Sequence, residues 1–186
     1  MKKYFLAMLL AGAAHVLAAD KPNILWIVSE DNDPYLGCYG DKLARTPTLD
    51  ALAKDGILYE RCHTMPVCAP SRFSIITGMY PASCGPANQM RASGHIPPWL
   101  HGFPMFLRRA GYFTSNNAKT DYNAPLSIPE MWNECGKRAH WRHRRPGQPF
   151  FAVFNTAITH ESCLHPERMT SDNVPRHTRP EDVRVP

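Results

Sequence analysis

A cysteine and an arginine four residues apart, Cys68 and Arg72, are the pair whose types and spacing point most directly to chemistry. On a helix, residues four apart lie on one face, one turn apart. If a helix begins at Cys68, its amino terminus favours an anion beside the thiol. The planar guanidinium of Arg72 can hold an oxyanion through paired hydrogen bonds. The pair therefore predicts a site for an anionic substrate, although a lone cysteine can equally be a buried structural thiol.

Two adjacent carboxylates, Glu30 and Asp31, follow an apolar run at residues 23–28. Carboxylate oxygens are the ligands that hard cations such as Ca²⁺ and Mg²⁺ prefer. The pair therefore predicts a metal site at the end of a strand, and a solvated acidic loop is the alternative. An EF-hand is excluded, because Leu36 occupies the position that needs glycine.

The elements that must position these residues alternate between strands and helices. Apolar runs at 23–28 and 150–155 predict buried strands of a parallel sheet. A helix is predicted from Pro47 to Gly56, with Thr46 as its N-cap and Leu49, Leu52 and Ala53 on one face. Further helices are predicted near 68–77 and 104–110, and strand-like runs at 57–59 and 112–114. This order predicts an α/β fold, in which ligands bind at the carboxyl ends of the strands.

The first 19 of the 186 residues combine a basic start, a short apolar run and small residues near Ala18 and Ala19. This pattern predicts a secretory signal peptide and a secreted or periplasmic protein. The run is too short to span a bilayer, so no stable membrane insertion is expected after cleavage. The chain carries a net charge of +5, and cleavage would remove two of its positive charges, Lys2 and Lys3. The mild basicity that remains suits an anionic substrate.

The six cysteines form no C-x-x-C pair, which excludes a zinc finger by spacing. Residues 137–145 are strongly basic and contain one tryptophan. They read as a solvated surface loop. If they bind a polyanion, a sulfated polysaccharide suits an exported protein better than nucleic acid, so no nucleic-acid partner is expected.

Four separated blocks resemble the sulfatase family, formylglycine-dependent (type I) enzymes of the alkaline phosphatase-like superfamily. The most specific block is Cys68-Ala69-Pro70-Ser71-Arg72, which is followed in register by Thr77-Gly78. The others are the segments 21–31 with 36–40, 117–121 and 149–160. The blocks cover most of residues 21–161, so the resemblance concerns the amino-terminal portion of such an enzyme.

The resemblance implies that a formylglycine-generating enzyme oxidises Cys68 to formylglycine. It also implies a Ca²⁺ (or Mg²⁺) ion held by Glu30, Asp31 and the modified Cys68. Arg72 would stabilise the nucleophile, while Lys119 and His160 would bind sulfate and assist the leaving group. Asp121 departs from the family pattern, which usually has histidine there, and Glu30 stands where aspartate is commoner.

By the same resemblance, residues 20–186 are expected to form the amino-terminal part of an alkaline phosphatase-like sandwich with a mostly parallel central sheet, incomplete at Pro186. The second pair of metal ligands is expected beyond it. Ser171-Asp172-Asn173 is rejected for this role, because no buried strand precedes it and Val174 replaces a glycine. The predicted activity is hydrolysis of sulfate esters of a glycan or an aryl alcohol. A phosphoester or phosphonate hydrolase and an inactive, polyanion-binding fragment are the alternatives.

Overall fold

A computed structural model describes residues 21–164 of the chain. The expected signal peptide at residues 1–19 and the rejected segment 171–173 lie outside this range, and neither is tested by the structure.

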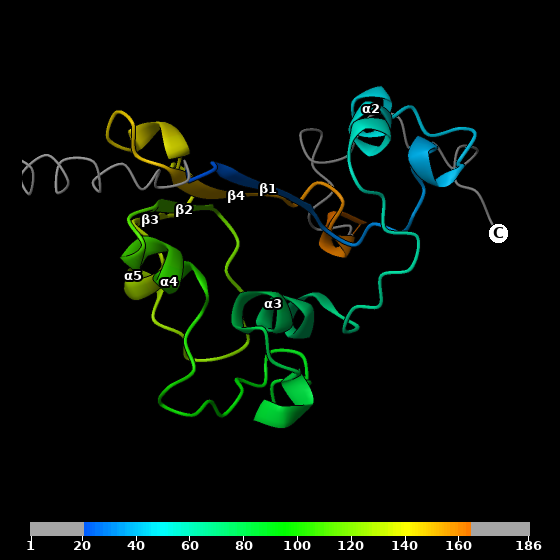
Figure 1. The fold of residues 1–186 in the computed structure, drawn as a ribbon. Helices are drawn as coiled ribbons and strands as arrows, with labels where there is room; N and C mark the ends of the chain where they lie inside the picture. The colour runs from blue at the N-terminus through cyan, green and yellow to red at the C-terminus, as the bar shows by residue number, and fades with distance from the viewer. Residues whose placement is uncertain (1–20, 165–186) are drawn as a thin grey trace, which may run out of the picture.

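The centre of the fold is a parallel four-stranded sheet in the order β1-β4-β2-β3 (Figure 1). The strands are β1 (Ile24–Ser29), β2 (Phe113–Asn117), β3 (Glu134–Cys135) and β4 (Phe150–Thr156). Strand β4 pairs with β1 over six residues and with β2 over five. Each pair is parallel, so the chain must cross over through helices and loops between strands. The α/β class and the parallel sheet predicted from the sequence are confirmed.

Helices cover mainly one face of the sheet. They are α2 (Pro47–Asp55), α3 (Cys68–Thr77), α4 (Pro104–Arg109) and α5 (Ile128–Met131). The 3₁₀ turns are η1 (Gly37–Tyr39), η2 (Pro81–Cys84), η3 (Trp141–His143) and η4 (Glu161–Leu164). In Figure 1, α3, α4 and α5 lie below the sheet, η3 lies above it, and α2 stands apart. The side chains of β4 alternate accordingly: Phe151 and Val153 join the core with the helices, and Phe150 stacks on Trp141 of η3 at 5.0 Å.

Phe151 is the centre of the core beneath the sheet. Its side chain is fully buried, and its ring lies 5.2 Å from the rings of Trp26 and Phe103 and 5.6 Å from that of Trp132. Aromatic contacts of this kind add to the free energy of simple burial. The cluster therefore fixes β1 and β4 against the helical layer.

Replacing Phe151 with alanine should lower the free energy of unfolding by about 3–5 kcal/mol, because a large cavity replaces a fully buried ring. Chemical denaturation followed by circular dichroism measures the change. Phe106→Ala is the matched control, since Phe106 is 54% exposed, and it should change stability by less than about 1 kcal/mol. Equal losses in the two variants would contradict this description of the core.

One sequence expectation is wrong, because residues 57–59 form no strand. Helix α2 forms as predicted, but its apolar face is exposed, with Leu49 at 45% and Leu52 at 62% exposure. Periodicity and propensity predict which residues can pack, but a strand also needs a partner strand, and no strand within residues 21–164 pairs with residues 57–59. Thr46 does stand at the N-cap of α2, but its hydroxyl bonds to Asp50 and to the amide of Gly37.

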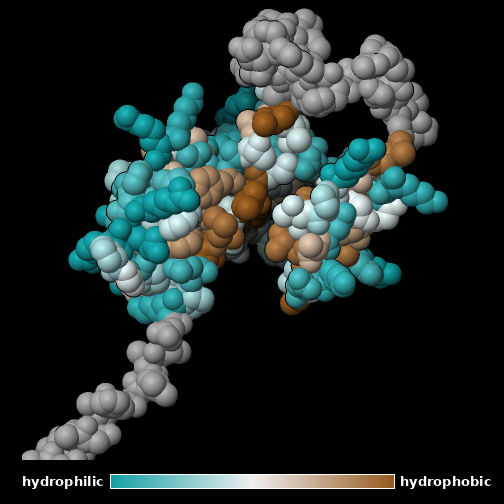
Figure 2. Space-filling model, turned by 90° about the horizontal axis from the view of Figure 1, so that it is seen from above, coloured by the Kyte–Doolittle hydropathy of each residue, from teal (hydrophilic) through white to brown (hydrophobic). Residues whose placement is uncertain are grey.

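The outer side of β1 is exposed and apolar. Leu25 and Ile27 are 50% and 75% exposed, and no strand within residues 21–164 pairs with the free edge of β1. A hollow of about 860 Å³ opens here; apolar residues dominate its lining, among them Leu25, Ile27, Ile57, Tyr59 and Ile75. Figure 2 shows hydrophobic side chains gathered around a depression in the middle of the molecule. This surface is larger than scattered exposed apolar residues would give.

Among the described residues, no helix is long and apolar enough to cross a membrane. The five cysteines whose side chains are described are free thiols: Cys38, Cys62, Cys68, Cys84 and Cys135.

Candidate active site

The site lies where the carboxyl ends of β1, β2 and β4 meet the amino terminus of α3. Glu30 directly follows β1, Lys119 lies two residues after β2, and His160 lies four residues after β4. Because the strands are parallel, their carboxyl ends share one edge of the sheet, and the loops that follow them can converge on one place.

Cys68 is the first residue of α3, and the packing of the helix orients it. Ala69, Pro70 and Phe73 are buried, which leaves Cys68 half-buried at the end of the helix that faces the site. Val67, the residue before it, has φ of 69°, a left-handed conformation that is rare for a β-branched residue. The thiol Sγ donates to Oδ2 of Asp121 at 3.8 Å. Asp121 therefore lies in contact with the candidate nucleophile.

Glu30 is the buried acid of the site, with only 4% of its side chain exposed. Its Oε2 accepts a hydrogen bond from Nζ of Lys119 at 2.8 Å. Its Oε1 has no hydrogen-bond partner and lies 3.7 Å from the guanidinium of Arg72. A buried carboxylate oxygen without a partner is costly, because it has lost its hydration. Glu30 therefore has unused capacity to bind a cation.

Arg72 ties α3 to the loop after β2. Its guanidinium donates to the carbonyls of Lys119 and Thr120 at 2.6 and 2.7 Å and to Oδ1 of Asn155 at 3.1 Å. It also lies over the ring of Tyr122, 5.7 Å from its centroid. Burial raises the pKa of Tyr122 to about 12, against a smaller opposing effect of the Arg72 charge, so the phenol stays neutral at physiological pH. The sequence reading gave Arg72 an oxyanion-binding role, and the structure adds a positioning role.

Lys119 is positioned by its backbone and neutralised by two acids. Its carbonyl accepts hydrogen bonds from Arg72 and from Nδ2 of Asn116 at 3.0 Å. Its Nζ bonds to Glu30 and lies 3.9 Å from Oδ2 of Asp121. The ammonium therefore points into the site, where it can meet an anionic substrate.

Asn116 should be essential for the position of Lys119. Its side chain is fully buried and bonds to the Lys119 carbonyl, to Sγ of Cys135 at 3.4 Å and to Nδ2 of Asn155 at 3.1 Å. Asn116→Ala should lower the free energy of unfolding by about 1–3 kcal/mol, because these buried partners lose their bonds. Thermal unfolding measures the effect. Asn88→Ala is the matched control, because Asn88 is exposed and its side chain makes no hydrogen bond within residues 21–164, and it should change stability little. Equal melting temperatures in all three proteins would contradict the role given to Asn116.

Asp31 and His160 are the remaining sequence-predicted site residues, and both lie next to η4. Oδ2 of Asp31 accepts a hydrogen bond from the amide of Glu161 at 2.8 Å, which links the end of β1 to the loop after β4. Nδ1 of His160 lies 2.8 Å from Oγ of Ser162 and 2.5 Å from Oε2 of Glu161. These contacts fix the imidazole, so that Nε2 remains available to another group.

Two groups of side chains in this site can hold a metal ion. Ligand atoms of Glu30, Cys68 and His160 lie within 4.8 Å of one another, and so do those of Asp31, His160 and Glu161. The carboxylates suit a hard cation, whereas the thiol and the imidazole suit softer ones. Oε1 of Glu30, which accepts no hydrogen bond, and the exposed carboxylate of Asp31 are the oxygen ligands that a hard divalent cation prefers, but they belong to different groups, which share His160.

The structure brings all the sequence-predicted site residues to one edge of the sheet. Sequence reasoning missed four further side chains: the amides of Asn116 and Asn155, the ring of Tyr122, and the carboxylate of Glu161. Asn155 and Asn116 lie near the ends of apolar or β-forming runs. A polar residue at the end of a strand was the only sequence feature that could have indicated a place in the site. Asp121 was noted in the sequence for its departure from the family pattern, and the structure places it against Cys68.

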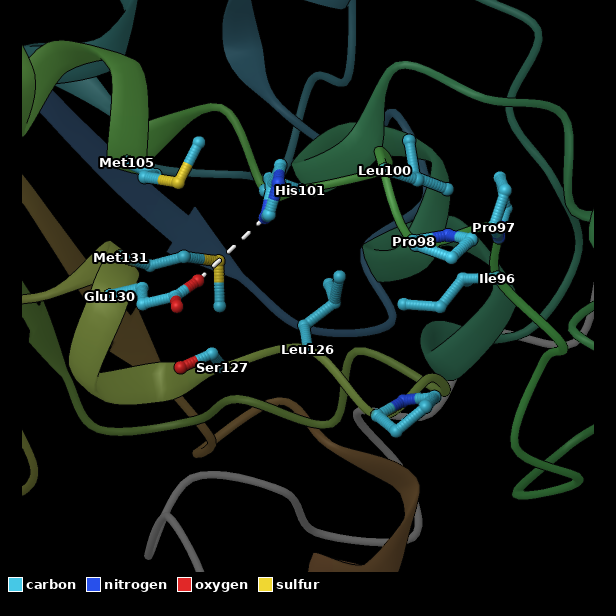
Figure 3. Close-up of a pocket in the computed structure, with 12 residues that line it drawn as sticks. Ile96, Pro97, Pro98, Leu100, His101, Met105, Leu126, Ser127, Glu130 and Met131 are labelled. Atoms are coloured by element: carbon cyan, nitrogen blue, oxygen red, sulfur yellow. Dashed lines mark ion pairs between the residues drawn. The ribbon is translucent and has the colours of Figure 1, made fainter.

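A second pocket, of about 250 Å³, lies between α4, α5 and the loop before them (Figure 3). Apolar residues dominate its lining, and its only ion pair joins His101 and Glu130 at 3.7 Å. Glu130 is 56% exposed, so this pair contributes little to stability. None of the site residues lines the pocket, and it is not part of the candidate active site.

A family model described as sulfatase matches residues 22–134, which is more than half of the chain. The chain belongs to the sulfatase family. It is 44% identical over 167 residues to an ulvan-active sulfatase of Formosa agariphila, covering 82% of this chain and 27% of that protein. It is 36% identical over 127 residues to human steryl-sulfatase, covering 62% of this chain and 21% of the relative. The chain thus spans about a quarter of the length of these sulfatases.

Solved structures share the fold of this sulfatase chain. A protein in complex with its substrate D-glucosamine-2-N,6-O-disulfate superposes with a TM-score of 0.64 at 20% identity, covering 76% of this chain and 35% of the other. A 2-O GAG sulfatase superposes with a TM-score of 0.59 at 19% identity, covering 77% and 36%. Because the sequence identities are only 20% and 19%, these superpositions show a shared fold and nothing more. They confirm that the parallel sheet and its helical layer are arranged as in these proteins.

Proposed function

We propose that this chain carries the nucleophile of an exported enzyme that hydrolyses sulfate esters of a saccharide. The observation that supports this most is the position of Cys68, at the start of α3 and within 4.8 Å of Glu30 and His160, in a chain of the sulfatase family. The relatives are named as an ulvan-active sulfatase and a steryl-sulfatase, and the similar structures are described as a complex with D-glucosamine-2-N,6-O-disulfate and as a 2-O GAG sulfatase.

Cys68 would act after oxidation by a formylglycine-generating enzyme. The hydrated aldehyde supplies two hydroxyls on one carbon, one to attack sulfur and one to lose its proton later, when the aldehyde re-forms and sulfate leaves. The carboxylate of Asp121 lies where it can accept a hydrogen bond from this group, as it does from the thiol. The approach of Cys68 to Asp121 thus orients the reacting side chain.

Lys119 and His160 would bind the sulfate group and assist the departing alcohol. The ammonium of Lys119 offsets negative charge on the sulfate oxygens. His160 is held through Nδ1, and its Nε2 can donate a proton to the leaving oxygen. Arg72 holds the loop that carries Lys119 and so fixes the distance between the nucleophile and the Lys119 ammonium.

Glu30, Asp31 and the modified Cys68 would hold the divalent cation, which we infer to be Ca²⁺ or Mg²⁺ because two of the three ligands are carboxylates. Such an ion lowers the pKa of a bound hydroxyl and offsets the charge of the sulfate. Within the chain, Oε1 of Glu30, which is buried and accepts no hydrogen bond, supports this assignment.

Mass spectrometry of the tryptic peptide from Cys62 to Arg72 tests the proposal. The protein is produced together with a formylglycine-generating enzyme, and fragment ions distinguish Cys62 from Cys68. We expect an aldehyde at Cys68 and an unmodified thiol at Cys62. The neighbouring peptide from Phe73 to Arg91 contains Cys84 and serves as the control within the same sample. Only unmodified thiol at Cys68 would count against the proposal.

Export is a separate part of the proposal and rests on the sequence of residues 1–19. Amino-terminal sequencing of the protein recovered outside the cytoplasm should show a start within one or two residues of Ala19. An intact Met1 in that fraction would contradict it.

A further inference from the structure

The basic stretch at residues 137–145 does not form one patch, because it runs from the carboxyl ends of the strands to their amino ends. At its start, the amide of Gly136 bonds to the carbonyl of Asn116 at 2.9 Å, near the carboxyl end of β2. At its end, Arg144 lies over the ring of Phe150, the first residue of β4. A five-residue strand is about 13 Å long, so the two ends of the basic stretch lie about that far apart. Only the first residues of the stretch therefore lie at the carboxyl ends of the strands, where the site is.

Several of the cationic side chains toward the end of the stretch are already engaged. Arg144 donates to the carbonyl of Gln148 at 2.9 Å and lies over Trp141, as does Arg142. His143 lies 2.8 Å from Oε2 of Glu134. These contacts hold η3 against β4 and leave these groups less free to bind a ligand.

Lys137 and Arg138 differ from these residues. Both are exposed, and within residues 21–164 neither side chain has a hydrogen-bond or ion-pair partner. They line a polar hollow of about 690 Å³. The only acid in its lining is Glu134, whose carboxylate is already bonded to His143 and to the amide of His140. The hollow therefore presents two free positive charges and no free negative one.

The backbone of this hollow is attached to the loop that carries Lys119. Nδ2 of Asn117 donates to the carbonyls of Lys137 and Ala139, at 2.8 and 3.2 Å. Asn117 precedes Lys119 by two residues, so their Cα atoms lie within about 7 Å of each other. A single asparagine thus fixes the position of Lys137 relative to the ammonium in the active site.

We propose that Lys137 and Arg138 form a subsite for a second anionic group of the substrate, next to the sulfate ester that is cleaved. The substrate class is then a sulfated polysaccharide with charged groups on neighbouring sugars, rather than an isolated aryl sulfate. This inference rests on the proposed function, because the subsite gains its meaning from the adjacent reaction. Specificity arises as the second group engages the free ammonium and guanidinium, and a substrate without that group leaves them unpaired.

The test compares two double variants with the same change of charge. Lys137→Ala/Arg138→Ala removes the subsite. Lys54→Ala/Arg109→Ala is the matched control, with exposed cations on α2 and α4. Heparin is the probe for binding, measured by titration calorimetry over a range of salt concentrations. The subsite variant should bind heparin roughly tenfold more weakly, the difference expected for about 1.4 kcal/mol, with a shallower salt dependence. The control should bind like the parent protein.

Turnover provides the second readout. The kcat/KM for a disulfated heparin disaccharide should fall by a similar factor in the subsite variant, while that for 4-nitrophenyl sulfate should stay unchanged. Unchanged heparin affinity, or an equal loss in the control, would overturn the inference. If Cys68 remains a thiol, the proposed enzymatic function fails, and the heparin titration still decides whether Lys137 and Arg138 bind a polyanion.

Discussion

Replacing Cys68 with alanine should abolish the hydrolysis of sulfate esters, lowering kcat/KM on the order of 10⁴-fold or more, the scale seen when an enzyme loses its nucleophile. In the proposed mechanism every other group in the site assists an attack on sulfur, and none of them can replace the attacking oxygen. Lys119 and His160 are placed to offset charge and move protons, and Arg72 is bonded to backbone carbonyls. The measurement is steady-state turnover of an aryl sulfate by the full product of the gene.

Cys62→Ala is the matched control for this prediction. Cys62 is an exposed free thiol six residues before Cys68, outside the site. This variant should retain the turnover of the parent protein, and both variants should unfold at the same temperature as the parent. If Cys68→Ala keeps more than a tenth of the parent activity, Cys68 is not the nucleophile.

Arg72→Ala should destabilise the fold strongly, lowering the free energy of unfolding by about 3 kcal/mol. Three hydrogen bonds, two to the loop after β2 and one to β4, are lost. The buried carboxylate of Glu30 also loses one of its two cationic neighbours. For a domain of this size the melting temperature should fall by roughly 10 °C, as measured by differential scanning calorimetry.

Two further variants separate charge from geometry at this position. Arg72→Lys retains the positive charge near Glu30 but cannot reproduce the planar fork, so its loss should be intermediate. Arg109→Ala removes an exposed arginine at the end of α4 and should leave the melting temperature almost unchanged. If all three variants melt together, Arg72 does not hold the site together.

Local patterns carried enough information to predict most of the sheet. Strands β1 and β4 are short apolar runs rich in β-branched and aromatic residues, and both were predicted within one or two residues. Helix α2 was predicted from the proline at its start and the glycine that follows it. Strand β3 has only two residues, Glu134 and Cys135, too few for any period to be visible. Its pairing with β2 depends on a tertiary contact.

The partners within the site were not predictable in the same way. Glu30 and Lys119 are 89 residues apart, and their hydrogen bond exists because β1 and β2 both flank β4 in one parallel sheet. The engagement of Arg72 with the carbonyls of Lys119 and Thr120 has no sequence signature, because any residue supplies a carbonyl. Likewise, the basic residues 137–145 are continuous in the sequence, and only the fold shows that they are divided between the carboxyl and the amino ends of the strands.

The sequence by itself determined the family and the class of the fold, and it singled out Cys68 as the candidate nucleophile. It could do so because Cys68 to Arg72 is a contiguous motif and because strands and helices follow local periods. The tertiary structure decided which groups touch Cys68, how Glu30 is desolvated and paired, and which of the basic residues remain free near Lys119. Those properties depend on burial and on distances between residues remote in the chain, and the order of β1, β4, β2 and β3 sets both.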